Sequence, residues 1–181
     1  MATLSFKTQF AWGDQTYFIP KIWKGLIDNQ GMYDDYMSYV NTVLNSGNEK
    51  IMEAFIPVKD INTIVPKIHT IREDPHDLWK PGRKIHMAVF NKTKNRFQFA
   101  PVLECKSVQR ITIAHINKTH IVHIGDDCIL PISDYAICGG IIPLKLKKLV
   151  RNDGFNSAED FFRYFNKDFT GKIVHWTEYK Y

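Results

Sequence analysis

The middle of the chain is dense in residues that favour β-strands, and this pattern limits the fold more than any other feature. Residues 96–116 (RFQFAPVLECKSVQRITIAHI) are rich in β-branched and aromatic side chains, which predicts one or two strands. Pro81 and Gly82 mark a turn between two further strands. The other expected strands are residues 4–10, 69–73, 84–90, 119–124, 128–130 and 171–179. So many short strands predict a sheet or a barrel as the framework of the fold.

Helical patterns flank this region. Residues 33–45 carry apolar side chains at helical spacing, namely Tyr36, Val40, Val43 and Leu44. Residues 156–169 start with Ser157 and, three positions later, Asp160, which is a pattern that caps helix N-termini. The apolar stripe of this second helix is Phe161, Phe162, Phe165 and Phe169. Shorter helices are expected at residues 20–26 and 144–150. The order of elements predicts an α+β fold around a mainly antiparallel sheet or small barrel with flanking helices.

The composition is that of a globular protein. Hydrophobic residues make up 44% and charged residues 24% of 181 residues, which suits one domain with a core. No apolar run is long enough to cross a membrane, and no secretory signal precedes the first strand. The three cysteines, Cys105, Cys128 and Cys138, are too widely spaced for a disulfide framework or a zinc site. We therefore expect a cytoplasmic protein without a cofactor.

The charge is unevenly distributed along the chain. Residues 1–60 hold 5 basic and 7 acidic side chains, whereas residues 61–181 hold 19 basic and 12 acidic ones and all 7 histidines. A basic region of this size favours an anionic partner such as a nucleic acid or a nucleotide. Solubility alone explains the same charge equally well.

Several kinds of site are missing from the sequence. It contains no phosphate-binding loop, no dinucleotide-binding glycine pattern and no serine-nucleophile elbow. His115, His120 and His123 are close in sequence, but His120 and His123 would face opposite sides of a strand. We therefore expect no metal site here.

The segment KIHTIRED, residues 67–74, concentrates groups that handle protons and bind anions. Thr70 and Arg72 would share one face of a strand, whereas Lys67 reaches Thr70 only if the chain changes direction before the strand. Pro66 makes this change plausible. Lysine supplies a cation or, when desolvated, a base, and arginine supplies a fork for phosphate or carboxylate. A site here requires that Lys67 and Thr70 open into the same solvent-accessible hollow.

This segment and the following LWKPGRKIHMAV resemble the signature of the ASCH domain, a family of the PUA-like superfamily. The matching element is Lys67, Thr70, Ile71 and Arg72, and Gly82 then leads into a strand. The C-terminal stretches NDGFNSAEDFFRYF and GKIVHWTEYKY resemble uncharacterised ASCH-like proteins of phages and gut-type bacteria. The resemblance covers residues 66–181 and implies one PUA-like domain, a small β-barrel with helices at its ends. Residues 27–62 are then a helical insertion.

Two functions follow from the resemblance. PUA-like domains generally bind RNA or modified nucleobases, which implies a basic cleft next to the KxxTIR segment. Some small bacterial ASCH proteins are amidohydrolases that remove an acetyl group from the exocyclic amine of cytidine with a lysine, a threonine and a glutamate. Lys67 and Thr70 match the first two of these, and the third is Asp153 or Glu104. In such an enzyme Lys67 takes the proton from Thr70 or from a water molecule, and backbone amides or Arg72 stabilise the oxyanion.

The binding function needs no chemistry and is the one we favour. Its expected contacts are a stacking aromatic ring and cations for phosphates. The candidates for these contacts are Trp79, His69, Arg72, Lys80, Arg83 and Lys84. Trp176 lies on an alternating strand and is expected in the core. A third class is an accessory protein whose helix at residues 33–45 contacts another protein through Tyr36, Met37 and Tyr39.

Overall fold

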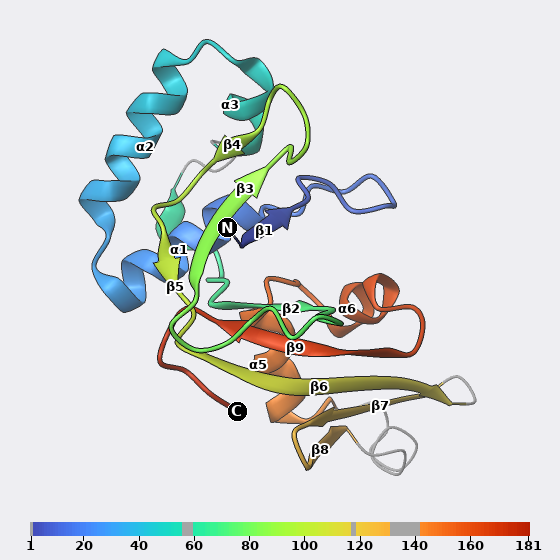
Figure 1. Ribbon diagram of the computed structural model, residues 1–181. Helices are drawn as coiled ribbons and strands as arrows, with labels where there is room; N and C mark the ends of the chain where they lie inside the picture. Colours follow the sequence, from blue (N-terminus) through green and yellow to red (C-terminus); the bar gives the residue numbers. More distant parts are fainter. Residues whose placement is uncertain (1, 56–59, 117–118, 131–141) are drawn as a thin grey trace. The chain divides into compact units, whose positions relative to one another are not determined.

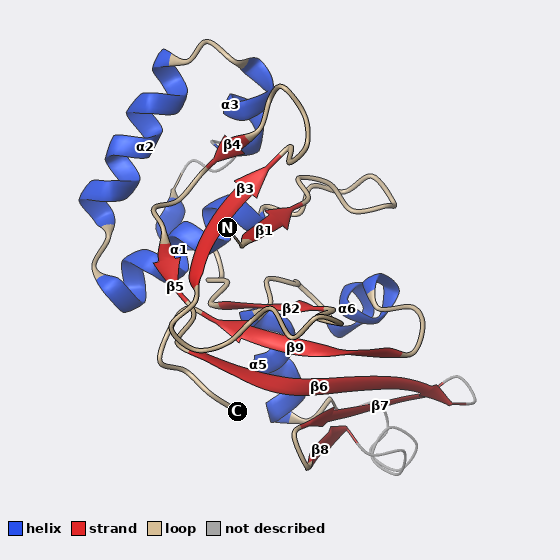
Figure 2. Ribbon diagram, viewed as in Figure 1, coloured by secondary structure: helices blue, strands red, loops and turns tan. Residues whose placement is uncertain are grey.

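The structure is a computed structural model that describes residues 2–55, 60–116, 119–130 and 142–181. Within these residues the chain forms five α-helices and two β-sheets, which confirms the expected α+β class (Figures 1 and 2). Cys138 and part of the expected insertion, residues 56–59, lie outside the described residues. Two compact units divide the chain, and each unit combines two separate segments. Unit 1 is Met1–Ile68 with Gly82–Glu104, and unit 2 is His69–Pro81 with Cys105–Tyr181.

Unit 1 contains a four-stranded sheet around the central strand β3. Its strands are β1 (Thr3–Phe6), β3 (Lys84–Val89), β4 (Phe97–Gln98) and β5 (Leu103–Glu104). Strand β1 pairs with β3 in parallel, whereas β4 and β5 pair with β3 antiparallel. Parallel neighbours need a long connection, and the helices of the unit lie in the chain between β1 and β3. They are α1 (Phe18–Gln30), α2 (Tyr33–Asn45), α3 (Glu49–Phe55) and the short 3₁₀ helix η1 (Ile61–Thr63).

The core of unit 1 is built around Trp23 of α1. Its indole is fully buried, and its N–H donates to the carbonyl oxygen of Phe99 at 2.9 Å. Tyr36 and Tyr39 of α2 pack against this ring, with ring centroids 5.5 and 5.3 Å away. The predicted helix at residues 33–45 is confirmed, but its predicted apolar stripe is partly wrong. Val43 is buried, whereas Leu44 is 50% exposed, because the helix turns the tyrosines and Val43 toward the core.

Unit 2 contains a five-stranded sheet in the order β2-β9-β6-β7-β8, and all its pairs are antiparallel. The strands are β2 (His69–Arg72), β6 (Ser107–Ile116), β7 (Thr119–Ile124), β8 (Asp127–Leu130) and β9 (Phe169–His175). One face carries buried isoleucines at alternate positions, which form the core of the unit. They are Ile71, Ile111, Ile113 and Ile173.

The two helices of unit 2 are α5 (Leu144–Asn152) and α6 (Ala158–Tyr164). Helix α5 ends where Gly154 takes a φ of 89°, a conformation that glycine adopts without strain. Helix α6 begins at Ser157, whose hydroxyl accepts from the backbone N–H of Asp160 at 3.0 Å, so the predicted cap is confirmed. The helix is shorter than predicted, because Phe169 already belongs to β9.

The barrel expected from the resemblance is not formed by the described strands. They fall into two separate sheets, and neither sheet closes on itself. Strand β2 is an edge strand, and its backbone finds a side-chain partner where a barrel would place another strand. That the whole chain acts as one domain stays a prediction, as does the reading of residues 27–62 as an insertion.

Candidate functional site

Lys67 lies before strand β2, as the predicted change of chain direction requires. It belongs to unit 1, and β2 starts two residues later. Its backbone N–H donates to the carbonyl oxygen of Lys21 in α1 at 2.8 Å. Its ammonium nitrogen lies 4.8 Å from the ring centroid of Phe18, a cation–π distance. Lys67 is 1% exposed, so its side chain is part of the interior.

Thr70 and Arg72 share one face of β2, as predicted. In unit 2 they pair across the strands with Val174 and Lys172 of β9. Thr70 is 3% exposed. The solvent-accessible hollow that a site at Lys67 and Thr70 requires is therefore not visible, because both side chains are buried.

Asp153 lies beside the KxxTIR strand, although 82 residues separate it from Ile71 in the sequence. Its carboxylate accepts the outward-facing backbone N–H of Ile71 at 3.1 Å. The edge amide is thereby satisfied without another strand. The same carboxylate oxygen lies 3.6 Å from Nδ1 of His69, and Asp153 is 3% exposed. Of the two acids predicted for the third catalytic position, Asp153 thus lies next to this strand in unit 2.

A buried polar cluster covers the same side of β2 and β9. The hydroxyl of Tyr181 lies 2.7 Å from Nε2 of His69 and accepts from the side-chain amide of Asn152 at 3.0 Å. The ring of His175 lies 5.2 Å from that of His69. Burial, with smaller contributions from the neighbouring His69 and Lys180, lowers the pKa of His175 to about 3. Burial also raises the pKa of Tyr181 well above its usual range, although Asn152 opposes this. His175 and Tyr181 are therefore uncharged near pH 7, and the hydroxyl of Tyr181 connects His69 of β2 with Asn152 of α5.

The other predicted site residues are spread over both units. Glu104 faces Lys84 across β5 and β3 in unit 1, with their charged atoms 3.4 Å apart, so a surface ion pair accounts for both. Arg83 is exposed in the same unit. In unit 2, Lys80 pairs with Asp77 at 2.8 Å.

Trp79 is only 4% exposed, so its indole offers no open face for stacking, contrary to what its Pro/Gly-containing loop suggested. Trp176 is buried, as predicted.

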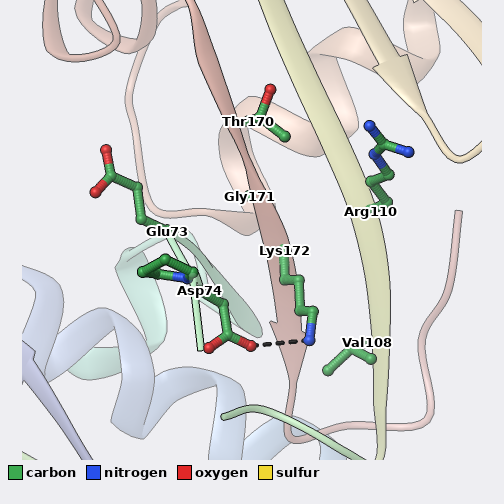
Figure 3. A pocket seen from close by; sticks show the side chains of 8 residues that line it. Glu73, Asp74, Val108, Arg110, Thr170, Gly171 and Lys172 are labelled. Atoms are coloured by element: carbon green, nitrogen blue, oxygen red, sulfur yellow. Dashed lines mark ion pairs between the residues drawn. The ribbon is translucent and has the colours of Figure 1, made fainter. Parts of the chain in front are cut away.

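A pocket opens on the other face of the unit 2 sheet, directly after the KxxTIR segment (Figure 3). Its volume is about 430 Å³, and we call it the β6–β9 pocket. It is lined by Glu73, Asp74, Pro75, Val108, Arg110, Thr170, Gly171 and Lys172. None of the ten residues predicted from the sequence lines it, but Arg72 immediately precedes its first residue. Register explains its polar floor, because Arg72, Lys172 and Arg110 lie in one row across three strands.

Lys172 fastens one wall of this pocket to β9. Its ammonium contacts the carboxylates of Asp74, at 2.8 Å, and of Asp77, and it donates to the carbonyl oxygen of Trp79 at 3.1 Å. Asp74 in turn accepts from the backbone N–H groups of Leu78 and Trp79 at 2.7 and 2.9 Å. These contacts order the loop after β2 into a fixed wall.

The pKa values of this network follow from the same contacts. Hydrogen bonds from Lys172 and Lys80 lower the pKa of Asp77 to about 2. Burial acts to raise the pKa of Asp74, but the hydrogen bonds from Lys172 and from the two amides outweigh it and lower the pKa. Burial opposes the charge of Lys172, but both aspartates raise its pKa above the usual value. The network therefore stays ionised over the whole neutral range.

The charged side chains of the β6–β9 pocket balance one another. Glu73 and Asp74 oppose Arg110 and Lys172, and neither Glu73 nor Arg110 has an ion pair with another residue of the described chain. The pocket thus presents a carboxylate and a guanidinium beside the hydroxyl of Thr170. The sequence did not reveal this pocket, because alternation in β6 and β9 marks Arg110 and Lys172 as outward-facing but does not show that these strands are neighbours.

Comparisons with known proteins add no assignment, because no family model, no curated protein and no solved structure matches the chain. In the part of the chain that the structure covers, no helix is long and apolar enough to cross a membrane. The same residues hold no group of three or more potential metal ligands.

Proposed function

We propose that the chain is an ASCH-like protein with a PUA-like fold, and that it binds a nucleoside, or one nucleotide of an RNA, in the β6–β9 pocket. The observation that carries the proposal is the place of this pocket. It begins at Glu73, one residue after the KxxTIR element on which the resemblance to ASCH domains depends. The pocket therefore adjoins the segment where the family resemblance places a ligand.

The size and polarity of the pocket suit such a ligand. A volume of about 430 Å³ lies within the range of small-molecule sites, roughly 300–1,000 Å³. The edge of a nucleobase presents donors and acceptors side by side, and carboxylate and guanidinium groups are their complements. Glu73 supplies the acceptor and Arg110 the donors.

The balance of charge refines the expectation of a basic cleft. Lys172 is already neutralised by Asp74 and Asp77, so Arg110 is the lining cation that remains for a phosphate. A site that neutralises many phosphates would carry an excess of lysine and arginine. We therefore favour recognition of a base with at most one phosphate at this pocket over the binding of a long RNA backbone.

The test is a titration of the ¹⁵N-labelled full chain with the four ribonucleosides and their 5′-monophosphates, followed by NMR. We expect saturable shifts at residues 73–75, 108–110 and 170–172. Arg110→Ala should weaken binding about tenfold or more, because it removes a charged hydrogen-bond donor. The control is Arg151→Ala, which removes an exposed arginine from the end of α5. An unchanged spectrum with every ligand, or equal losses in the two variants, would refute the assignment.

The amidohydrolase function remains a second candidate, and one observation favours it. Asp153, the acid that matches the family pattern by position, contacts the strand that carries Thr70. In the implied reaction a base takes the proton from the attacking hydroxyl or water, and the carbonyl oxygen becomes an oxyanion. The C–N bond then breaks and the amine leaves with a proton. When water is the nucleophile the acetyl group leaves as acetate, and when the Thr70 hydroxyl is the nucleophile a water molecule must then hydrolyse the acetyl ester of Thr70 to acetate. The resemblance assigns the role of base to Lys67.

This second candidate is tested with N⁴-acetylcytidine and detection of cytidine. If the assignment is correct, Lys67→Ala and Asp153→Asn each lower the rate by about a hundredfold or more. Glu104→Gln is the matched control, since Glu104 forms a surface pair with Lys84. Loss of activity in Glu104→Gln with full activity in Asp153→Asn would reverse the assignment of the acid. Absence of turnover with a set of N-acyl nucleosides would exclude the reaction.

A further inference from the structure

Helix α2 carries a second apolar face in addition to the one that packs in unit 1. Its core face is formed by Tyr36, Tyr39 and Val43, and these side chains already satisfy the packing around Trp23. The second face consists of Tyr33, Met37, Val40 and Leu44, and we call it the α2 ridge. Tyr33 is 52%, Met37 39% and Leu44 50% exposed, and Val40 is half-buried.

The spacing of the α2 ridge is that of a helix-packing seam. Its members follow one another after four, three and four residues, the alternation that lets one helix dock along another. The eleven steps from Tyr33 to Leu44 rise by about 17 Å, three turns of a helix. In Figure 1 the helix stands at the outside of unit 1. Tyrosine and methionine are enriched at protein interfaces, and methionine adapts its shape to a partner.

The sequence around helix α2 is acidic. Residues 27–55 contain five acidic side chains and a single basic one, Lys50. Helix α2 itself has Asp34 and Asp35 in its first turn and no basic residue. Asp34 and Asn41 directly follow Tyr33 and Val40, so they flank the seam on the side away from the core, where coiled coils place the charges that select a partner.

These charges discriminate among the possible occupants. A second copy would bring the same acidic helix against the first, which is repulsive. An anionic membrane surface attracts helices with lysine and arginine, which α2 lacks. A partner helix with an apolar face and basic flanks complements both the ridge and its rim.

We propose that the α2 ridge is a docking site for a basic amphipathic helix of another protein. The ridge supplies the apolar contacts, and Asp34, which flanks it, supplies the attraction for lysine and arginine. This proposal is independent of the β6–β9 pocket, since it involves only residues of unit 1.

The test uses the full chain and a helical peptide of about 14 residues, four turns, built from leucine and lysine. A peptide with glutamate in place of lysine is the control ligand. We expect the basic peptide to bind, with NMR shifts centred on residues 33–44, and the acidic peptide not to bind. Added salt should weaken binding.

Two variants identify the surface. Leu44→Ser should weaken binding tenfold or more, whereas Leu144→Ser, which changes another exposed leucine in unit 2, should leave it unchanged. Asp34→Lys should shift the preference toward the acidic peptide, because Asp34 flanks the ridge. Circular dichroism establishes that each variant is folded.

Three results would overturn the proposal. They are equal binding of the basic and acidic peptides, shifts confined to residues outside α2, and self-association of the protein that Leu44→Ser abolishes. The last result would show that the ridge holds a second copy.

Discussion

The substitution Gly171→Ala tests how the floor of the β6–β9 pocket is built. A Cβ atom at position 171 would lie 2.3 Å from the carbonyl oxygen of Arg72 and 2.8 Å from ring atoms of Phe169. The oxygen belongs to the backbone of β2, which pairs with β9 at this point. It cannot move away without disturbing the strand pairing, so glycine is required here by close approach.

The cost of the added methyl group follows from this clash. Overpacking of this kind destabilises a protein by about 1–3 kcal/mol. For a chain of this length each kcal/mol lowers the Tm by roughly 2–4 °C, so we expect a loss of roughly 2–12 °C. The affinity for a nucleoside should fall as well, because β2 leads directly into Glu73 and Asp74 of the pocket wall.

The assay is thermal unfolding followed by circular dichroism, with Thr170→Ala as the control. Thr170 is the preceding residue of the same strand, is exposed and lines the same pocket. Its substitution should change the free energy of unfolding by no more than about 0.5 kcal/mol. A Tm of Gly171→Ala within about 1 °C of that of Thr170→Ala would refute the close approach of β2 and β9.

Three further predictions concern titration and buried contacts. The folded-state pKa of His175 is depressed below the ordinary 6.5, so its contribution to stability is complete above pH 6.5 and is lost as the pH falls toward about 3. In urea unfolding, the free energy of unfolding should therefore fall less steeply between pH 7 and pH 5 in His175→Phe than in the wild type. Identical slopes of the free energy of unfolding against pH would contradict this. Asp153→Ala should lower the free energy of unfolding by about 1–3 kcal/mol, because it strands the buried N–H of Ile71, whereas Asp153→Asn retains an acceptor and should cost less; equal losses in urea unfolding would disprove the role of this hydrogen bond. In Lys172→Met the pKa of Asp77, measured by NMR, should rise from about 2 toward 3.8. The control Lys145→Met should raise only the pKa of Asp127. An unchanged pKa of Asp77 in Lys172→Met would exclude the contact with Lys172.

Local signals in the sequence predicted the individual elements well. The capping hydroxyl of Ser157, the positive φ of Gly154 and the helix at residues 33–45 depend on neighbours a few positions away. Alternation predicted where most strands lie, but residues 96–116 form three strands rather than one or two, and Trp176, although buried, follows the end of β9 at His175.

Pairing between distant segments was not predictable in this way. The parallel pair of β1 and β3 and the neighbourhood of β2 and β9 join residues about 80 to 100 positions apart. The closed barrel was an inference from the resemblance, and the described strands form two open sheets instead.

The candidate site residues also divide into those that the sequence predicted correctly and those that depend on contacts between distant segments. Asp153 was chosen by position in a motif and does lie beside β2, whereas the burial of Trp79 and the pairing of Glu104 with Lys84 depend on tertiary packing. Lys172 and Arg110 were not predicted as site residues, because only the pairing register of β2, β9 and β6 places them in one row with Arg72.

The most direct test of the central claim is a competition between ligands for the wild-type β6–β9 pocket, read from the NMR signal of the Arg110 side chain. We predict that one nucleoside shifts this signal with a Kd below about 1 mM, equivalent to about −4 kcal/mol, and that ribose or inorganic phosphate alone does not displace it. A signal that responds to phosphate but to none of the four nucleosides would contradict the account.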